Sequence, residues 1–152
     1  MSPAIDCSIC GKLTRIKTKD WKLVLADQPY VCSPKCVLDW ISNLKDGEPA
    51  YWFGGEPNEL LTPHQMIFRS KFEERFFQWL CRENIASGYE LYRFRVGDGW
   101  YTPDFYLIDD YGFIETKGKW QLGQRTKFRR FRKQYPNVPI LIVPWLLEKE
   151  FK

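Results

Sequence analysis

Two carboxylates and one lysine stand close together in the stretch YTPDFYLIDDYGFIETKGKW, which runs from Tyr101 to Trp120. Asp104 comes first, and Glu115 and Lys117 follow further along the same stretch. Carboxylate oxygens are hard ligands that suit Mg²⁺, which takes the rest of its coordination shell from water and substrate phosphate. A lysine beside such a site can polarise or deprotonate an attacking water. The set therefore predicts metal-assisted hydrolysis of a phosphodiester bond.

The spacing indicates a β-hairpin that would hold the three side chains on one face. If strands 100–109 and 112–117 pair around a two-residue turn, Asp104 lies opposite Lys117. Because side chains alternate faces along a strand, Asp104, Glu115 and Lys117 would share one face and meet at one end of the sheet. A three-residue or bulged turn would change this arrangement. The other face, expected to be the core face, carries Phe105, Leu107 and Ile114.

We therefore expect a Mg²⁺ or Mn²⁺ site whose ligands are Asp104, Glu115 and the backbone carbonyl of Thr116. Lys117 would assist the nucleophile or hold a phosphate oxygen. The alternative is an ordinary surface hairpin with a cross-strand Asp–Lys ion pair. An acidic helix before the hairpin and a basic helix after it favour the metal site.

Four cysteines form two short-spaced pairs, Cys7/Cys10 and Cys32/Cys36. Zn²⁺ prefers four ligands in a closed tetrahedron, and the pattern CxxC followed by CxxxC supplies them. The second pair would straddle a helix start, where the positive end of the helix dipole stabilises thiolates. We predict a structural zinc site that resembles a treble-clef zinc finger, with disulfides or redox-active thiols as the alternatives. Cys81 stands apart and is expected in the core.

The composition is that of a globular protein. Of the 152 residues, 44% are hydrophobic, 17% aromatic and 28% charged, which is enough for one compact domain or for one small domain joined to a minimal module. The sequence contains no apolar run of the roughly 18–20 residues that would span a membrane. The first residues resemble no signal peptide. We expect a cytoplasmic protein, in a bacterium or a phage-infected cell, with no membrane contact.

Two modules and a linker are predicted along the chain. Residues 1–46 would form the four-cysteine zinc-binding module, in which WKLVLADQPYVC predicts two short strands. Ser33 is a plausible N-cap for a helix that has Pro34 at its first position. Residues 47–66 read as a Gly-, Pro- and acid-rich linker, part of which is expected to pack on a domain surface. Residues 67–152 would form the second domain.

The second domain reads as α-β-β-β-α-β and predicts a mixed α/β (α+β) fold. A strong helix is expected between Ile67 and Gly88, because apolar residues recur there at helical spacing. YELYRFRV alternates as a strand, and the charged hairpin follows it. LGQRTKFRRFRKQYP predicts a basic helix with Phe128 and Phe131 in the core. PILIVPW is apolar throughout, as is typical of a strand inside a sheet.

Positive charge is concentrated after the hairpin. Eight Lys or Arg residues and no Asp or Glu lie between Lys117 and Lys133, although the net charge of the whole chain is only +4. Such a segment favours a polyanion such as DNA, and the alternative is a solvated helix face. Our candidates for contact with DNA phosphates are Lys119, Arg125, Lys127 and Arg129.

Pro103-Asp104 together with Glu115-Thr116-Lys117 resembles the PD-(D/E)XK nucleases, which have a restriction-endonuclease-like fold with an αβββαβ core. Within that superfamily the chain is most similar to the phage endonucleases that resolve four-way (Holliday) DNA junctions. The shared features are YTPDF, ETKG with a Trp two residues on, and FRS just before the first acidic helix. The resemblance covers roughly residues 68–145.

This resemblance implies a metal-dependent endonuclease that cuts branched DNA. It also implies that a helical glutamate after FRS completes the acidic site: Glu73, with its neighbour Glu74 as a substitute. A homodimer is expected, since a paired cut needs two active sites. The phage enzymes lack a four-cysteine module, so a site-specific or nicking nuclease of duplex DNA is an alternative. A non-catalytic zinc-finger protein that binds DNA is a second alternative.

Overall fold

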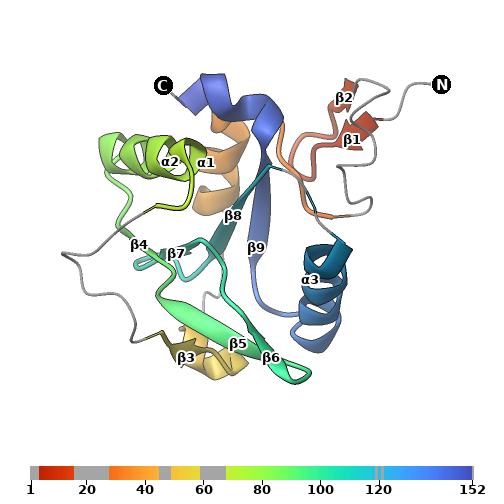
Figure 1. Ribbon diagram of the computed structural model, residues 1–152. Helices are drawn as coiled ribbons and strands as arrows, with labels where there is room; N and C mark the ends of the chain where they lie inside the picture. Colours follow the sequence, from red (N-terminus) through yellow and green to blue (C-terminus); the bar gives the residue numbers. More distant parts are fainter. Residues whose placement is uncertain are drawn as a thin grey trace.

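The structure is a computed structural model that describes residues 4–15, 28–44, 49–58, 68–118, 120 and 122–151. Helices and strands both contribute, so the predicted mixed α+β class is confirmed (Figure 1). The helices are α1 (Pro34–Ser42), α2 (Lys71–Arg82) and α3 (Leu122–Gln134), with 3₁₀ helices at Ala50–Phe53 and Trp145–Phe151. The strands are β1 (Ala4–Asp6), β2 (Leu13–Arg15), β3 (Glu56–Pro57), β4 (Ser87–Tyr89), β5 (Tyr92–Val96), β6 (Gly99–Tyr101), β7 (Phe105–Leu107), β8 (Phe113–Lys117) and β9 (Ile140–Pro144).

A four-stranded sheet in the order β4-β7-β8-β9 forms the centre of the fold. β7 and β8 are antiparallel, and β9 runs parallel to β8 after the crossover through α3. Every residue of β9 is buried, as the apolar run had predicted. Helices α1 and α2 pack on one face and α3 packs on the other, so both faces are core (Figure 1).

Helix α2 forms within the segment that the sequence predicts to be helical, but it ends at Arg82. The expected end at Gly88 was wrong, because Ser87 and Gly88 belong to strand β4. The Ser70 side chain accepts a hydrogen bond from the Glu73 N–H and caps the first turn. An apolar stripe points into the core and contains Phe72, Phe76, Trp79 and Leu80. Burial of each of these side chains contributes roughly 1.5–3 kcal/mol to stability. Cys81 is exposed, so its predicted core position was wrong: it lies off the stripe.

Helix α3 and its aromatic residues are as predicted. Phe128 and Phe131 are buried among aromatic side chains of the second core cluster. The neighbouring basic residues face outward: Lys127, Arg129 and Arg130 are exposed. The helix ends at Gln134, two residues before Pro136, because proline cannot continue a helix.

Two of the predicted strands are interrupted. YELYRFRV is not one strand, since Glu90 has a left-handed backbone (φ 50°) that separates β4 from β5. The predicted strand 100–109 was also wrong. It divides into β6 and β7 around Pro103, which has no N–H for a ladder. A separate three-stranded sheet has the order β3-β5-β6, with β5 paired to both neighbours, so the strand count exceeds that of the predicted αβββαβ core.

The β7–β8 connection is longer than the two-residue turn that we expected. The pairs are Phe105 with Ile114 and Tyr106 with Phe113. This register differs by two residues from the predicted one, so every side chain keeps its predicted face. Asp104 consequently precedes β7 at the position opposite Glu115, and the expected Asp104–Lys117 pairing was wrong.

The N-terminal segment extends the central sheet. Tyr30 makes a parallel bridge to Ile142 of β9. The Val31 N–H donates to the Ile142 carbonyl (3.2 Å), and the Ile142 N–H donates to the Pro29 carbonyl (2.8 Å). Helix α1 begins at Pro34 with Ser33 as its N-cap, as predicted. This segment therefore shares a core with α2 and β9, while the division into domains 1–46, 47–66 and 67–152 remains a prediction.

The described part of the expected linker also packs on the fold. Ala50 is buried, its N–H donates to the Tyr106 hydroxyl (3.3 Å), and β3 pairs with β5. Residues 21–27, which hold most of the two strands expected before Cys32, lie outside the described residues. Among the helices that the structure describes, none has the length and apolar character needed to cross a bilayer.

Candidate active site and metal centre

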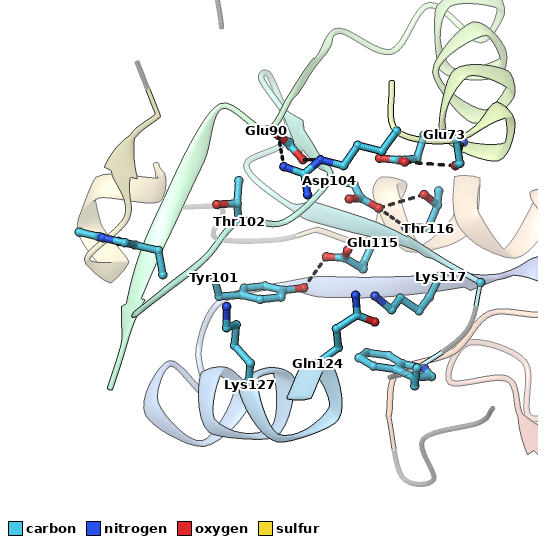
Figure 2. A pocket seen from close by; sticks show the side chains of 15 residues that line it. Glu73, Glu90, Tyr101, Thr102, Asp104, Glu115, Thr116, Lys117, Gln124 and Lys127 are labelled. Atoms are coloured by element: carbon cyan, nitrogen blue, oxygen red, sulfur yellow. Dashed lines mark hydrogen bonds and ion pairs between the residues drawn. The ribbon is translucent and has the colours of Figure 1, made fainter. Parts of the chain in front are cut away.

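The predicted hairpin residues line a polar cavity of about 500 Å³ (Figure 2). The cavity lies at the end of the central sheet, between the start of α2 and the start of α3. Four acidic residues from different parts of the fold line the cavity: Glu73, Glu90, Asp104 and Glu115. All four residues are buried. The clustering of buried carboxylates in one cavity is the first requirement for a site that holds cations.

Asp104 is fixed across the hairpin by Thr116. One Asp104 carboxylate oxygen accepts hydrogen bonds from the Thr116 N–H and hydroxyl, each at 2.9 Å. Burial raises the pKa of Asp104 well above its usual range, and the charges of Glu115 and Glu73 add to this rise. The two bonds from Thr116 oppose it. Thr116 thus holds the Asp104 carboxylate in place, and no ion pair to Asp104 is found among the described residues.

Glu115 occupies the middle of β8, between the apolar strands that flank it. The Tyr101 hydroxyl donates to its carboxylate. Burial raises the pKa of Glu115 to about 7, although the Tyr101 hydrogen bond and the charge of Lys117 act in the opposite direction. Two neighbouring buried carboxylates with raised pKa values, and hard oxygen donors, fit a divalent cation such as Mg²⁺.

Glu73 approaches the same cavity from the first turn of α2. Its carboxylate accepts hydrogen bonds from the Tyr89 hydroxyl (2.6 Å) and the Ser70 hydroxyl (3.1 Å). Burial, followed by the hydrogen bond to Glu73, raises the pKa of Tyr89, which keeps this phenol a donor. Glu74 is exposed and is absent from the lining of the cavity. The structure thus places Glu73, and not its neighbour, beside Asp104.

Lys117 ends β8 at the mouth of the cavity. Its Nζ lies 4.9 Å from the ring centroid of Trp120. Trp120 is buried, and its indole N–H donates to the Tyr30 hydroxyl (2.9 Å). Figure 2 shows the lysine extending towards the space below Glu115. A cation–π contact of this kind holds the ammonium group near the carboxylates without neutralising it.

The predicted DNA-binding residues divide into three groups. Lys127, one helical turn beyond Gln124, lines the cavity from α3. Arg125 and Arg129 lie on the same helix but do not line it, and Arg129 is exposed. Lys119 lies outside the described residues. The basic helix therefore presents one of its predicted contacts directly to the carboxylate cavity.

Three side chains around the carboxylates were not predicted as site residues, although one of them, Tyr101, begins the YTPDF motif. Tyr101 comes from β6, Tyr89 from β4, and Glu90 from the left-handed break after β4. Each meets the site only through strand pairing between distant segments. We expected an unbroken strand through Glu90. The Glu90 side chain reaches the cavity only because the strand is interrupted there, and no glycine or proline in YELYRFRV predicts that interruption.

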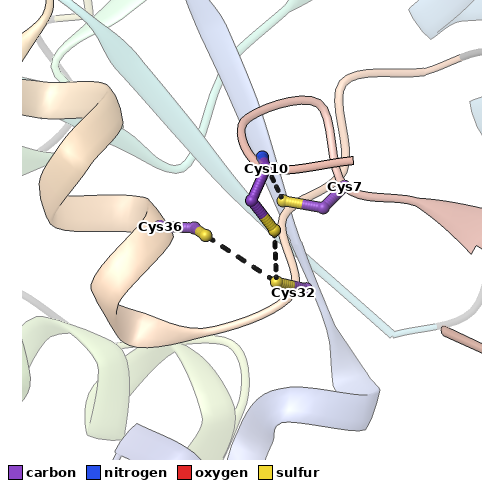
Figure 3. Close-up of side chains that lie close together, drawn as sticks. All are labelled: Cys7, Cys10, Cys32 and Cys36. Atoms are coloured by element: carbon purple, nitrogen blue, oxygen red, sulfur yellow. Dashed lines mark hydrogen bonds between the residues drawn. The ribbon is translucent and has the colours of Figure 1, made fainter. Parts of the chain in front are cut away.

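The four paired cysteines converge on one point, and their ligand atoms all lie within 4.8 Å of one another (Figure 3). The Cys10–Cys32 and Cys32–Cys36 sulfur distances are 3.5 and 3.7 Å. Zn–S bonds of about 2.3 Å in a tetrahedron place sulfurs about 3.8 Å apart, whereas a disulfide requires about 2.05 Å. The arrangement therefore fits a four-thiolate metal site better than two disulfides.

Backbone amides and burial give the cysteine thiols different pKa values. Burial raises the pKa of Cys7, but N–H groups of Cys10 and Ile9 outweigh it and lower the pKa to about 7. Burial and the neighbouring sulfurs raise the pKa of Cys32 to about 12. N–H donors on a sulfur are typical of thiolate ligands, and four crowded thiolates require a cation. The donor set fits Zn²⁺.

Comparison with known proteins gives one consistent family. Residues 60–145 match phage endonuclease I. The chain is 39% identical over 80 residues to Endodeoxyribonuclease 1 of Enterobacteria phage T3, which covers 50% of this chain and 52% of that protein. It is 35% identical over 80 residues to Endonuclease I of Escherichia phage T7, covering 50% of this chain and 53% of that protein. No solved structure matches the chain.

The chain spans about half the length of the curated relatives that it matches. The matched region contains Glu73, Asp104, Glu115 and Lys117, and the cysteine cluster lies before it. Because this region is more than half of the 152 residues, and its carboxylates meet in one cavity, the chain belongs to the phage endonuclease I family.

Proposed function

We propose that this protein is a Mg²⁺-dependent DNA endonuclease of the PD-(D/E)XK class that hydrolyses phosphodiester bonds in branched DNA. The observation that carries the proposal is the meeting of buried Asp104 and Glu115 with Glu73 and Lys117 around one cavity. The names of the T3 and T7 relatives, both endonucleases, support the same activity.

Asp104, Glu115 and the Thr116 carbonyl would hold the divalent cation, and Glu73 would support them. The Thr116 N–H points to Asp104, and the N–H and C=O of one strand residue face the same neighbouring strand. The Thr116 carbonyl therefore faces the Asp104 side. When bound, Mg²⁺ or Mn²⁺ would polarise the phosphate and lower the pKa of a water molecule.

The protein's own groups prepare the site for this chemistry. Thr116 orients Asp104, Tyr101 orients Glu115, and Tyr89 orients Glu73, each through a hydrogen bond to the carboxylate. The Lys117 ammonium group would hold the attacking water or a phosphate oxygen. Oriented donors and charges cost no reorganisation during the reaction, which is the main source of electrostatic catalysis.

DNA would approach along α3, whose basic residues border the acidic cavity. Lys127 would contact a phosphate near the site, and Arg125 and Arg129 would contact more distant phosphates. Lys119 is a further candidate for a phosphate contact. Selectivity for four-way junctions rests on the resemblance to phage resolving enzymes. The described part of the chain supplies one such carboxylate cavity, so paired cuts would require a homodimer. Such an enzyme would act in the cytoplasm of a phage-infected bacterium.

The cysteine cluster would hold a structural Zn²⁺. Cys32 directly follows Val31, which hydrogen-bonds to β9, and Cys36 lies in the first turn of α1. A metal ion would therefore join the turn at Cys7 and Cys10 to the edge of the central sheet. The zinc module would stabilise the sheet that carries Glu115 and Lys117.

The test uses a labelled four-way junction and a linear duplex of matching sequence. Each substrate is incubated with and without Mg²⁺, without a chelator, because a chelator would also remove metal from the cysteines. Mg²⁺-dependent, symmetrical cuts in the junction alone are expected. Glu115→Gln and Lys117→Ala should abolish cleavage and retain DNA binding, and cleavage by both variants would contradict the proposal.

Other outcomes would favour the alternative functions. Cleavage of both substrates would favour a site-specific or nicking nuclease of duplex DNA. Salt-dependent binding of DNA without cleavage, in Mg²⁺ or Mn²⁺, would favour a non-catalytic DNA-binding protein.

A further inference from the structure

Arg69 and Glu90 form an ion pair at the wall of the cavity, outside the set of residues assigned to the reaction. Arg69 Nε lies 3.3 Å from Glu90 Oε1, and Arg69 Nη2 donates to Glu90 Oε2 at 3.4 Å. The exposed fraction of the Arg69 side chain is 76%, and that of Glu90 is 10%. A buried carboxylate thus holds a guanidinium group that remains open to solvent.

Glu90 is fixed to the carboxylate site through its backbone. Its N–H donates to the Asp104 carbonyl (2.7 Å), and its own carbonyl accepts from Asn58 Nδ2 (2.9 Å). Its left-handed φ of 50° is unusual for a residue other than glycine and has an energetic cost. Strain of this kind persists where the surrounding structure holds it. The Glu90 carboxylate is therefore kept at one position relative to Asp104.

Arg69 is anchored to the same site from its own backbone. Its N–H donates to the Tyr89 hydroxyl (3.4 Å), which in turn donates to Glu73. Two of the five N–H donors of the guanidinium face Glu90. In the described part of the chain Arg69 has no further side-chain partner. The remaining donors are free to bind an anion.

The excess of acidic residues around the cavity would repel a DNA phosphate unless basic side chains lie beside it. Among the described residues that line it, four are acidic and three, Arg69, Lys117 and Lys127, are basic. Glu90 and Lys127 lie on opposite sides of the Asp104–Glu115 pair (Figure 2). Arg69, bonded to Glu90, is therefore the cation on the α2 side. A DNA strand that crosses the carboxylates would pass from Lys127 to Arg69.

We infer that Arg69 binds a phosphate of the cleaved strand next to the scissile one, and that Glu90 is the positioning residue that holds the guanidinium group for it. The inference rests on the proposed function, because it names a substrate contact of that site. A planar guanidinium pre-oriented by a carboxylate suits a phosphate better than a flexible lysine does.

The experiment measures kcat and KM on substrates in which single phosphates near the cut are replaced by uncharged methylphosphonates. Wild-type protein should lose roughly tenfold to a hundredfold in kcat/KM at one flanking position, the effect of one charge-assisted hydrogen bond. Arg69→Ala should lose a similar factor on unmodified DNA and lose nothing further at that position. Arg69 is exposed, so this substitution leaves the core intact.

Two further variants and a control separate phosphate binding from a structural role. Glu90→Gln should reduce sensitivity at the same position, and Arg69→Lys should not restore it, since lysine lacks the planar fork. Arg82→Ala, which removes an exposed arginine at the far end of α2, should match the wild-type profile at every position. A general loss of stability would lower cleavage equally on all substrates.

The inference would be overturned if Arg69→Ala lost no more activity than Arg82→Ala. It would also fail if the Arg69→Ala loss multiplied with the methylphosphonate loss at every position. Wild-type cleavage that no flanking methylphosphonate changes would overturn this inference alone. Absence of wild-type cleavage on any unmodified DNA would overturn the proposed function itself, and the inference with it.

Discussion

Thr116 donates both its backbone N–H and its hydroxyl to a single carboxylate oxygen of Asp104, each at 2.9 Å. The two residues come from the two arms of the hairpin. These two hydrogen bonds therefore join the arms beyond the pair formed by Phe105 and Ile114. The second Asp104 oxygen lies outside these two bonds. A residue of the hairpin itself, Thr116, therefore orients the Asp104 carboxylate that we propose as a metal ligand.

Thr116→Val should reduce cleavage by about tenfold and leave the fold intact. Valine has the shape of threonine but lacks the hydroxyl, so Asp104 loses one of its two donors, which is worth about 1.5–3 kcal/mol for a charged acceptor. Cleavage rates at several Mg²⁺ concentrations would check this. Thr116→Ser keeps the hydroxyl and should behave as wild type. Equal losses in the two variants would show that the hydroxyl is not the cause.

Glu73→Gln and Glu74→Gln form a matched pair on adjacent residues. Glu73 is buried and bonded to Tyr89, whereas Glu74 is exposed. We expect Glu73→Gln to lower kcat by about a hundredfold or more, the order of effect of an active-site charge. Glu74→Gln should change kcat by less than about twofold. The reverse ranking would move the helical carboxylate of the site to Glu74.

Tyr101→Phe should shift the acid limb of the cleavage profile to higher pH. Burial raises the pKa of Glu115 to about 7 even though the hydrogen bond from the Tyr101 hydroxyl acts to lower it. Removal of the hydrogen bond to the charged form raises that pKa further. The measurement is kcat/KM against pH at a fixed, low Mg²⁺ concentration. Tyr92→Phe is the control, and identical profiles for both variants would contradict the expected coupling.

Without Mg²⁺, the free energy of unfolding should fall as pH rises through about 7. The folded-state pKa of Glu115, about 7, lies above its unfolded value, so the folded protein binds more protons. The contribution of Glu115 to the free energy of unfolding is fully present below the pKa of the unfolded state. It is lost as the pH rises through the pKa of the folded state. The raised pKa of Asp104 acts in the same direction. The loss for Glu115 alone is on the order of 3 kcal/mol.

Urea denaturation at pH 5 and pH 8 would measure this loss in wild-type protein and in Glu115→Gln. The variant has no charge at this position, so its stability should change less with pH and should exceed that of wild type at pH 8. Added Mg²⁺ should restore wild-type stability and affect the variant less. An equal change in the free energy of unfolding between pH 5 and pH 8 in the two proteins would falsify the claim that burial raises the pKa of Glu115.

Loss of the metal from the cysteines should destabilise the central sheet and reduce cleavage. Pro29 and Val31, just before Cys32, hydrogen-bond to Ile142, which lies opposite Glu115 across the β8–β9 pairing. We expect one Zn²⁺ per chain by elemental analysis. Cys32→Ser should bind less zinc and unfold with several kcal/mol less stability, since structural zinc contributes to folding directly.

Cys81→Ser is the matched control for the cysteine prediction. Cys81 is exposed and remote in sequence from the cluster, so its replacement should change neither zinc content nor stability. Equal effects of Cys32→Ser and Cys81→Ser would indicate that the four-cysteine cluster is not the metal site.

Local patterns in the sequence determined which residues could act and on which face they lie. The alternation of side chains along a strand put Asp104, Glu115 and Lys117 on one face, and a two-residue error in register left that face unchanged. Ser33 marked the start of one helix because capping is a contact within one turn. Cysteine spacing likewise marked the two pairs whose ligand atoms lie within 4.8 Å of one another.

Contacts between distant segments were decided only by the tertiary structure. The partners that orient the carboxylates, Tyr89 and Tyr101, come from separate strands, and the pairing of Tyr30 with β9 joins residues far apart in the chain. The break at Glu90 places a fourth carboxylate in the cavity. Long-range pairing depends on the free energy of the whole core and leaves no periodic signal in one segment, so local patterns cannot predict it.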